Sequence, residues 1–330
     1  MKMAAILVTM LAILIGIVQL QKPSSEVSSR FLPCPATEPT KRAYEIYTLI
    51  YTAIWIGIFA FVVAFQVYES LDAWGYLYLC GGLSLPFLLQ PFLLPSCGMG
   101  SPDERRKWYA RYSTKANLWI AVYSFIGNYW YTHYFYSVLK ASYSMPAHRL
   151  NNVPIALYFA THFYFSTYHA FSNVLLRWVT RSFEKGLMRN ILVSACRINT
   201  VAVYCMREIS ALTATIHDAL PFSKIKFWSV VISFSYFTAF METLTISSYP
   251  YYSFEDKHMA YTTGSAFYGI YFLVSFPTFF YFETQIDYKQ GKHATLWDTL
   301  VSSCGAGMMI LCLLDFVRLY IGVNLVVGGA

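Results

Sequence analysis

Eight apolar stretches, each about as long as a helix that crosses a bilayer, determine what this chain can fold into. A transmembrane helix needs about 20 mostly apolar residues, because in lipid only a helix or a closed barrel satisfies every backbone hydrogen-bonding group. We therefore predict an all-α fold, a polytopic transmembrane helical bundle of about eight spans. The predicted spans are residues 3–20, 46–68, 74–95, 117–139, 152–175, 225–247, 264–282 and 299–320.

The composition favours a membrane protein over a soluble globular domain. Charged residues make up only 12% of the chain, whereas about a quarter of the residues in a soluble domain are charged. Aromatic residues reach 19%, which suits aromatic-lined cavities and interfacial belts. Ordinary helix packing accounts equally well for any single aromatic residue.

Lysine and arginine residues gather in alternate loops. Loops 21–45, 96–116, 176–224 and 283–298 hold 19 of them, counting Lys226 just inside the sixth span, and the opposite side holds 4. Cytoplasmic loops carry the excess of basic residues, so both termini are predicted on the non-cytoplasmic side. The net charge of +7 therefore reflects topology, and we predict a lipid bilayer and no nucleic acid as partner.

The chain is predicted to have two regions. Residues 1–40 form an N-terminal anchor or signal with a linker, and residues 41–330 form the multi-span domain, with a basic insertion at about 179–222. Proline inside a helix kinks it, so the third span, residues 74–95, is predicted to be kinked. Its prolines are Pro86, Pro91 and Pro95.

The fifth predicted span carries a polar face that contains two histidines. Steps of four, three and four residues place the four side chains on one side of a helix. Neutral imidazoles in such a position donate, accept or shuttle protons. The alternative is a hydrogen-bonded face between packed helices. The residues are His162, Ser166, His169 and Asn173.

The sixth predicted span holds one carboxylate, Glu242, on a face with Ser235, Thr238 and Thr245. An ionisable group inside a membrane needs a partner or a task. Apolar surroundings favour the neutral carboxylic acid, which is a proton donor. The alternative is a structural glutamate paired with a histidine or arginine of a neighbouring helix.

For the other polar residues of the spans we predict mainly structural roles. In the fourth span one face carries four polar side chains, and His133 points about 100° away from the last of them. Asp315 and Arg318 are predicted to form an ion pair within the last span, and Asn151 and Asn152 to cap the fifth. The four polar residues of the fourth span are Asn117, Ser124, Asn128 and Thr132.

No cofactor-binding motif is present. The seven cysteines form no CxxC pair and no histidine cluster completes a zinc site, so we expect neither a metal nor a disulfide framework. The Walker A, GxGxxG strand-turn-helix and HExxH patterns are also absent. Nucleotide and metal chemistry therefore have no support in the sequence.

Four long blocks of the sequence carry a family resemblance. Lys115–Pro154 reads KANLWIAVYSFIGNYWYTHYFYSVLKASYSMPAHRLNNVP, and Phe159–Arg177 reads FATHFYFSTYHAFSNVLLR. Ser235–Met259 reads SYFTAFMETLTISSYPYYSFEDKHM, and Phe267–Phe280 reads FYGIYFLVSFPTFF. These blocks resemble the cycloeucalenol cycloisomerase family, also called cyclopropyl sterol isomerases, and the blocks around THYF and NNVP carry most of the specificity. The resemblance covers most of 41–322 and is absent from 1–40 and most of 179–222.

The resemblance implies an isomerase of sterol biosynthesis in a multi-pass membrane protein of the endoplasmic reticulum. The family opens the 9β,19-cyclopropane ring of a sterol precursor, converting cycloeucalenol to obtusifoliol. Protonation, carbocation formation and proton loss leave the atom count unchanged, so the resemblance implies no cofactor. It leaves the oligomeric state open.

The polar faces then suggest roles for single residues. We predict Glu242 as proton donor, His162 and His169 as relay or acceptor, and His133 as a reserve for these roles. Further side chains of the fourth and fifth spans are predicted to contact the sterol. They are Asn128, Thr132, Ser166, Asn173, Tyr129 and Trp130.

Three other functions stay open. Another membrane sterol isomerase, such as one that shifts a double bond from Δ8 to Δ7, also uses intramembrane acid and base groups. A transporter is a second alternative, although neither an internal repeat nor a pair of broken helices in corresponding positions is visible. A sterol-binding scaffold without turnover is the third.

Overall fold

The structure is a computed structural model that describes residues 31–96, 102–137, 140–181, 222–247, 249–287 and 293–321. The predicted first span, at 3–20, and most of the predicted insertion at 179–222 lie outside these residues. The chain divides into two compact units. One comprises 32–173 and 235–330, and the other comprises 1–31 and 174–234.

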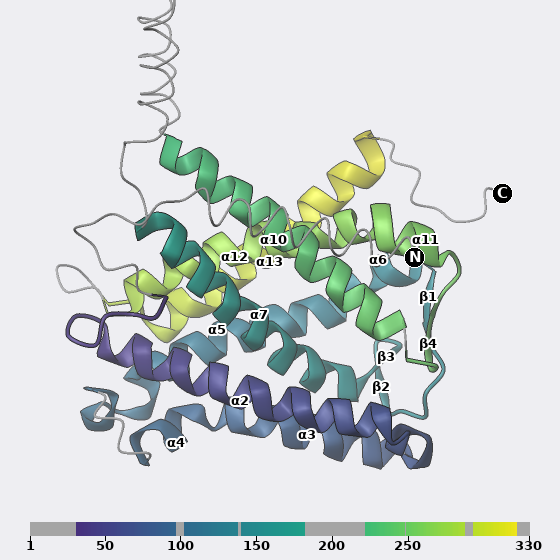
Figure 1. The fold of residues 1–330 in the computed structure, drawn as a ribbon, viewed down its shortest axis with the longest axis horizontal. Helices are drawn as coiled ribbons and strands as arrows, with labels where there is room; N and C mark the ends of the chain where they lie inside the picture. Colours follow the sequence, from purple (N-terminus) through teal and green to yellow (C-terminus); the bar gives the residue numbers. More distant parts are fainter. Residues whose placement is uncertain are drawn as a thin grey trace, which may run out of the picture. The chain divides into compact units, whose positions relative to one another are not determined.

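The described residues are mostly helical, as predicted (Figure 1). Three π-helical segments continue α-helices: η4 joins α5 to α6, η5 joins α11 to α12, and η6 follows α13. Short 3-10 turns, η1 to η3, lie at Val67–Ser70, Pro102–Arg105 and Trp108–Ala110. The helices are α2 (Pro39–Ala64), α3 (Ala73–Leu88), α4 (Gln90–Ser96), α5 (Tyr112–Ile126), η4 (Gly127–Tyr131), α6 (Thr132–Ser137), α7 (Ile155–Arg181), α10 (Phe222–Ser247), α11 (Lys257–Met259), η5 (Ala260–Gly264), α12 (Ser265–Ile286), α13 (Leu296–Phe316) and η6 (Val317–Ile321).

Four described helices are long and apolar enough to cross a membrane: Pro39–Ala64, Phe227–Ser247, Lys257–Ile286 and Leu296–Leu319. They correspond to four of the eight predicted spans. The predicted third span, 74–95, is interrupted at Leu89, between α3 and α4 and close to the prolines that predicted a kink. Four apolar helices of this length support membrane association.

The apolar side chains of the outermost helices face outwards. On α2, Ile50, Ile54 and Phe61 are each at least half exposed, and on α13 so are Met308 and Met309. In a soluble protein such surfaces would be covered. The long helix at Lys257–Ile286 is instead mostly buried. This arrangement suits a bundle whose solvent is lipid.

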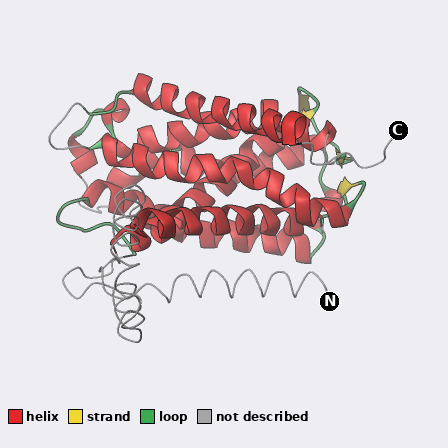
Figure 2. Ribbon diagram, turned by 90° about the horizontal axis from the view of Figure 1, so that it is seen from above, coloured by secondary structure: helices red, strands yellow, loops and turns green. Residues whose placement is uncertain are grey.

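Two short pairs of strands complete the fold (Figure 2). Strand β1 (Ala141–Tyr143) pairs antiparallel with β4 (Tyr252–Phe254), which places Tyr143 opposite Tyr252. Strand β2 (Arg149–Leu150) pairs with β3 (Val153–Pro154). The segments 141–143 and 149–154, which precede α7, are therefore held by backbone pairing.

The prediction that Asn151 and Asn152 cap the fifth span is wrong. Both have positive φ, 54° and 63°, and they form the two-residue turn between β2 and β3. Tight hairpin turns require left-handed backbone at both central positions, and asparagine tolerates it better than most residues. Helix α7 begins three residues later, at Ile155.

Helices α5 and α13 approach each other closely at Gly307. The Tyr131 hydroxyl donates a hydrogen bond of 2.8 Å to the Gly307 carbonyl oxygen. A Cβ atom at position 307 would lie 2.9 Å from that hydroxyl and 3.0 Å from the Ile126 side chain. Glycine is therefore required where these helices meet.

The predicted ion pair between Asp315 and Arg318 does not form. The salt bridges of the described chain join Lys41 to Glu283 and Arg106 to Asp103 and Asp287. Asp315 instead accepts a hydrogen bond of 2.5 Å from the Tyr134 hydroxyl. The helix widens to a π-turn from Val317, so regular α-helical spacing does not extend to Arg318.

A buried ion pair joins α2 to α12. The Lys41 ammonium lies 3.1 Å from Oε2 of Glu283, and both side chains are almost fully buried. The Asn173 side-chain amide donates to the same carboxylate oxygen. A buried charge is costly unless it is paired and hydrogen-bonded, so this cluster depends on all three residues.

Replacing Lys41 with methionine is expected to destabilise the protein by about 3–5 kcal/mol, because Glu283 would keep a buried charge without its cation. Thermal unfolding of the purified protein in detergent measures the effect. The double variant Lys41→Met/Glu283→Gln should recover much of the loss. Lys257→Met, at an exposed lysine, is the control. Equal melting of the single and double variants would contradict the role of the pair.

Candidate active site

Glu242 lies on α10 with its side chain buried. Its carboxyl group is hydrogen-bonded by the hydroxyls of Tyr168 on α7 and Tyr268 on α12. Its Oε2 atom has no hydrogen-bond partner among the described residues. Two hydroxyls, and no cation of the described residues, therefore hold this carboxyl group.

Seven tyrosines interact with the carboxyl group of Glu242, and we call them its tyrosine shell. Besides its two hydrogen-bond partners, five further tyrosines interact electrostatically with the carboxyl group. Within the described chain no salt bridge reaches it, so no cation seen there supports the alternative of a structural ion pair. The seven tyrosines are Tyr123, Tyr143, Tyr164, Tyr168, Tyr252, Tyr268 and Tyr271.

His169 is hydrogen-bonded at both ring nitrogens. Nδ1 lies 2.7 Å from the Phe165 carbonyl oxygen and Nε2 lies 3.0 Å from Oγ of Ser275 on α12. A carbonyl oxygen only accepts, so Nδ1 carries the proton and Nε2 of the neutral ring accepts from the serine. The Tyr123 hydroxyl interacts with the same serine, and it donates a hydrogen bond of 3.3 Å to the Tyr271 carbonyl oxygen. Tyr123 therefore interacts both with the serine that bonds His169 and, electrostatically, with Glu242.

His162 is buried without a hydrogen-bond partner. Neither ring nitrogen has one among the described residues, and the ring meets Phe87 edge-on at 6.3 Å. No hydrogen bond or salt bridge of the described chain joins Glu242 to His162 or His169. The predicted polar face of the fifth span is therefore buried as a whole, but its two histidines have different environments.

The other predicted site residues mostly bond within the protein. Asn128 donates to the Ser124 carbonyl at 2.9 Å, and Thr132 donates to the Gly127 carbonyl at 3.2 Å. Ser166 donates to the His162 carbonyl at 2.7 Å. Each of these three bonds reaches a backbone carbonyl four or five residues earlier in the chain.

The remaining predicted residues have other contacts, are partly exposed, or have side chains outside the described part of the structure. Asn173 donates to Glu283, in the ion-pair cluster. The Tyr129 ring stacks on Phe125 at 5.7 Å, and Trp130 is about half exposed. His133 lies in α6, and its side chain is outside the described part of the structure.

Sequence reasoning missed the tyrosines that hold Glu242. The chain contains 28 tyrosines, so residue type alone does not single out Tyr168 and Tyr268. Tyr168 also lies next to His169 and points to another side of α7. A helical-wheel analysis of each span therefore could not have joined Glu242 to either hydroxyl.

Aromatic rings pack beside the polar groups. Tyr268 contacts Tyr271 at 4.7 Å and Phe272 at 5.2 Å between ring centroids, and Phe276 meets His169 edge-on at 5.1 Å. The site is therefore apolar apart from hydroxyls, imidazoles and one carboxyl group. Among the described residues no group of three or more His, Cys, Asp or Glu is placed to hold a metal ion.

A comparison with known proteins identifies a curated relative. Cycloeucalenol cycloisomerase of Arabidopsis thaliana is 36% identical to this chain over 288 residues, which cover 87% of this chain and 89% of the relative. No family profile matches the chain, and no solved structure matches it. Identity at this level over most of both chains shows common family membership. The chain belongs to the cycloeucalenol cycloisomerase family.

Proposed function

We propose that this protein is a cycloeucalenol cycloisomerase, which opens the 9β,19-cyclopropane ring of a sterol precursor. The observation that carries the proposal is the buried carboxyl group of Glu242, held by hydroxyls and by no described cation. The relative at 36% identity bears the same activity in its name.

The reaction needs one proton delivered and one removed. Protonation of the bridging carbon, C19, breaks its bond to C9, turns C19 into a methyl group and leaves a tertiary cation at C9. Loss of the proton at C8 then forms the Δ8 double bond. Atoms and electrons balance without an oxidant or reductant.

Glu242 is the proposed proton donor. A cyclopropane bond is only weakly basic, so its protonation needs a well-placed acid. A carboxyl group in apolar surroundings favours its neutral form and retains the proton it must deliver. The hydroxyls of Tyr168 and Tyr268 orient the group and stabilise the carboxylate that remains after proton transfer.

The aromatic shell suits the carbocation. The faces of aromatic rings attract cations, and exclusion of water prevents hydroxide or water from adding to C9. The rings of Tyr271 and Phe272 pack against Tyr268, whose hydroxyl is hydrogen-bonded to Glu242. They are the proposed source of this stabilisation.

His169 is the proposed proton acceptor or relay. Its Nε2 atom accepts from Ser275, and Tyr123, which interacts with Ser275, also interacts electrostatically with Glu242. Rotation of the Ser275 and Tyr123 hydroxyls would join these groups into the proposed route by which the proton from C8 returns to Glu242. His162, with both nitrogens unpartnered among the described residues, is the second candidate, and His133 is the third.

The predicted contacts with the sterol stay predictions. They involve Asn128, Thr132, Ser166, Asn173, Tyr129 and Trp130.

A multi-pass protein of the endoplasmic reticulum with about eight spans is the proposed setting. The four apolar helices and the uneven distribution of basic loops support it. Both termini would then face away from the cytoplasm. A flat apolar substrate would enter from the lipid.

The alternative is a membrane sterol double-bond isomerase, since a buried acid and a histidine relay also serve that reaction. Supplying cycloeucalenol and a Δ8 sterol separately distinguishes the two. Conversion of only the Δ8 sterol would favour the alternative. A transporter or a non-catalytic sterol-binding protein would convert neither.

Glu242→Gln is expected to lower turnover of cycloeucalenol by at least about 10²- to 10⁴-fold, because glutamine has the shape of the acid but no proton to transfer. Sterol profiling of cells that accumulate cyclopropyl sterols measures the effect, with protein level measured in parallel. Glu255→Gln, at an exposed glutamate, is the matched control. Full activity of Glu242→Gln would remove this residue from the proton path.

His169→Gln is expected to reduce kcat by about 10²- to 10⁴-fold, the usual contribution of a general acid or base. Ser275→Ala should also reduce kcat, since it breaks the proposed route through Tyr123. Ser303→Ala, at a buried serine bonded to the Trp119 carbonyl, controls for loss of a buried hydroxyl. Unchanged kcat in His169→Gln together with a loss in His162→Gln would assign the role to His162.

Glycosylation acceptor sites test the proposed topology. A site inserted between Glu255 and Lys257 is expected to be glycosylated, because that loop is predicted on the non-cytoplasmic side. A site inserted at 288–292 is expected to stay unmodified. Gel mobility before and after deglycosylation reads out both. The reverse pattern would contradict the proposed orientation.

A further inference from the structure

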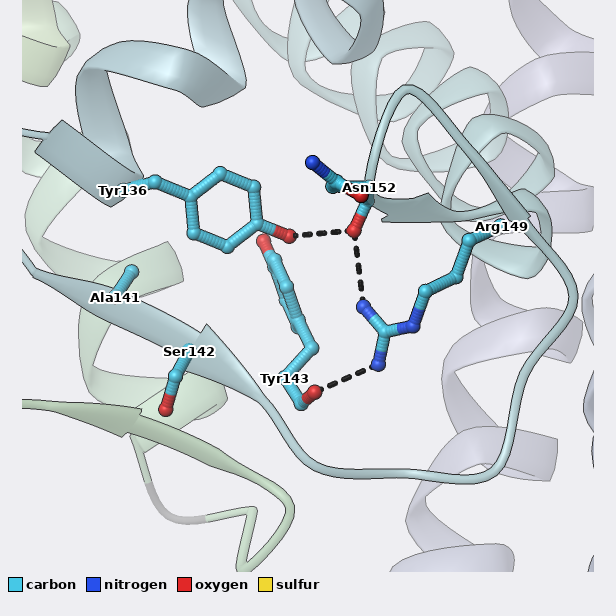
Figure 3. Close-up of a pocket in the computed structure, with 6 residues that line it drawn as sticks. All are labelled: Tyr136, Ala141, Ser142, Tyr143, Arg149 and Asn152. Atoms are coloured by element: carbon cyan, nitrogen blue, oxygen red, sulfur yellow. Dashed lines mark hydrogen bonds between the residues drawn. The ribbon is translucent and has the colours of Figure 1, made fainter.

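A pocket of about 380 Å³ lies where α6 meets the strands that follow it (Figure 3). Its size is near the lower end of the range for small-molecule sites. None of the roles above uses it. The lining residues are Tyr136, Ala141, Ser142, Tyr143, Arg149 and Asn152.

Arg149 is fixed in this pocket by the backbone. One terminal nitrogen, Nη1, donates to the Asn152 carbonyl at 2.9 Å, and Nη2 donates to the Tyr143 carbonyl at 2.7 Å. A guanidinium group has five N–H donors, so these two bonds hold its orientation and leave others for a ligand. Figure 3 shows the group at the rim of the pocket, between β2 and the Tyr143 backbone.

Two tyrosines add hydroxyl groups to the same pocket. The Tyr136 hydroxyl donates to the Asn152 carbonyl at 3.2 Å, and the rings of Tyr136 and Tyr143 meet edge-on at 5.6 Å. Figure 3 shows both hydroxyl ends turned towards the centre of the group of side chains. Fixed N–H and O–H groups at one place suit a small polar group that both donates and accepts hydrogen bonds.

Tyr143 connects the pocket to the shell around Glu242. It lies opposite Tyr252 in the pairing of β1 with β4, the two rings are 4.5 Å apart, and their hydroxyls are hydrogen-bonded. Both tyrosines interact electrostatically with Glu242. Burial raises the pKa of both hydroxyls well above the ordinary value, so both stay neutral donors at physiological pH.

We propose that this pocket binds the 3β-hydroxyl group of the sterol, through Arg149 and Tyr136, and so sets the position of the cyclopropane relative to Glu242. The inference rests on the proposed function. In a sterol the hydroxyl-bearing carbon, C3, and the carbon C10 of the cyclopropane lie at opposite corners of one six-membered ring. An anchored hydroxyl therefore places the reacting bond within about one ring of the pocket. Tyr143, which lines the pocket, and Tyr252, which is paired with it, both interact electrostatically with Glu242, which agrees with a short separation.

The position of the pocket in the chain agrees with a sterol whose hydroxyl end lies at the membrane surface. Residues 140–151 connect the fourth and fifth predicted spans, so the pocket lies towards the membrane surface, where the hydroxyl of a sterol meets water. The ring system would then point into the bundle, among the aromatic residues. The rest of the sterol is too large for this pocket and would lie outside it.

The experiment compares cycloeucalenol with its 3-deoxy analogue, using the full chain in proteoliposomes and mass spectrometry of the products. For the wild type, kcat/KM is expected to fall about 10- to 100-fold when the hydroxyl is absent, the range for hydrogen bonds to a charged group. In Arg149→Met and Tyr136→Phe this ratio should shrink towards one. Because the readout is a ratio on the same protein, partial loss of folded enzyme does not change it.

Tyr158→Phe is the matched control. Its hydroxyl donates to the Leu150 carbonyl of the same hairpin at 3.1 Å, but the residue does not line the pocket. The control should keep the wild-type ratio. A wild type that opens both sterols equally well, or pocket variants that discriminate as the wild type does, would overturn the inference while leaving the isomerase proposal intact. Failure to open either sterol would overturn both.

Discussion

The outer surface of this bundle is apolar, and the rest of the structure depends on that constraint. Residues such as Ile54 and Met308 face outwards, so polar side chains of the spans have their partners inside. A polar group buried without a hydrogen bond is costly. Many polar side chains therefore bond to carbonyls of their own helix, and others bond to side chains of neighbouring helices.

Charged groups obey this constraint in two different ways. Near the ends of α2 and α12, Lys41 and Glu283 neutralise each other, and Asn173 completes the cluster. Glu242 has only hydroxyl partners in the described chain, supplied by tyrosines. A paired carboxylate holds helices together, whereas a buried carboxyl group without a described cation is the proposed proton donor. The same residue type thus serves architecture at one site and the proposed chemistry at another.

Local signals in the sequence predicted much of the fold. Four of the eight predicted spans correspond to described helices long enough to cross a membrane, and the four polar residues of the fifth span are all buried, because apolar length and helical spacing are properties of one segment. Predictions that depended on neighbouring segments were wrong. Asn151 and Asn152 form a hairpin turn because β2 and β3 pair, and Asp315 bonds to Tyr134 because α6 lies beside the end of α13. No helical wheel contains that information.

The sequence by itself determined that the chain is helical and apolar, that it is related to cyclopropyl sterol isomerases, and that Glu242 lies in a membrane-length helix. Only the tertiary structure decided which groups surround that carboxyl group. Tyr168 and Tyr268 come from two other helices, and Tyr252 from a strand. Spacing along one helix fixes which side chains share a face, but packing between helices fixes what that face meets. The environment that makes Glu242 a candidate acid is therefore a property of the assembled bundle.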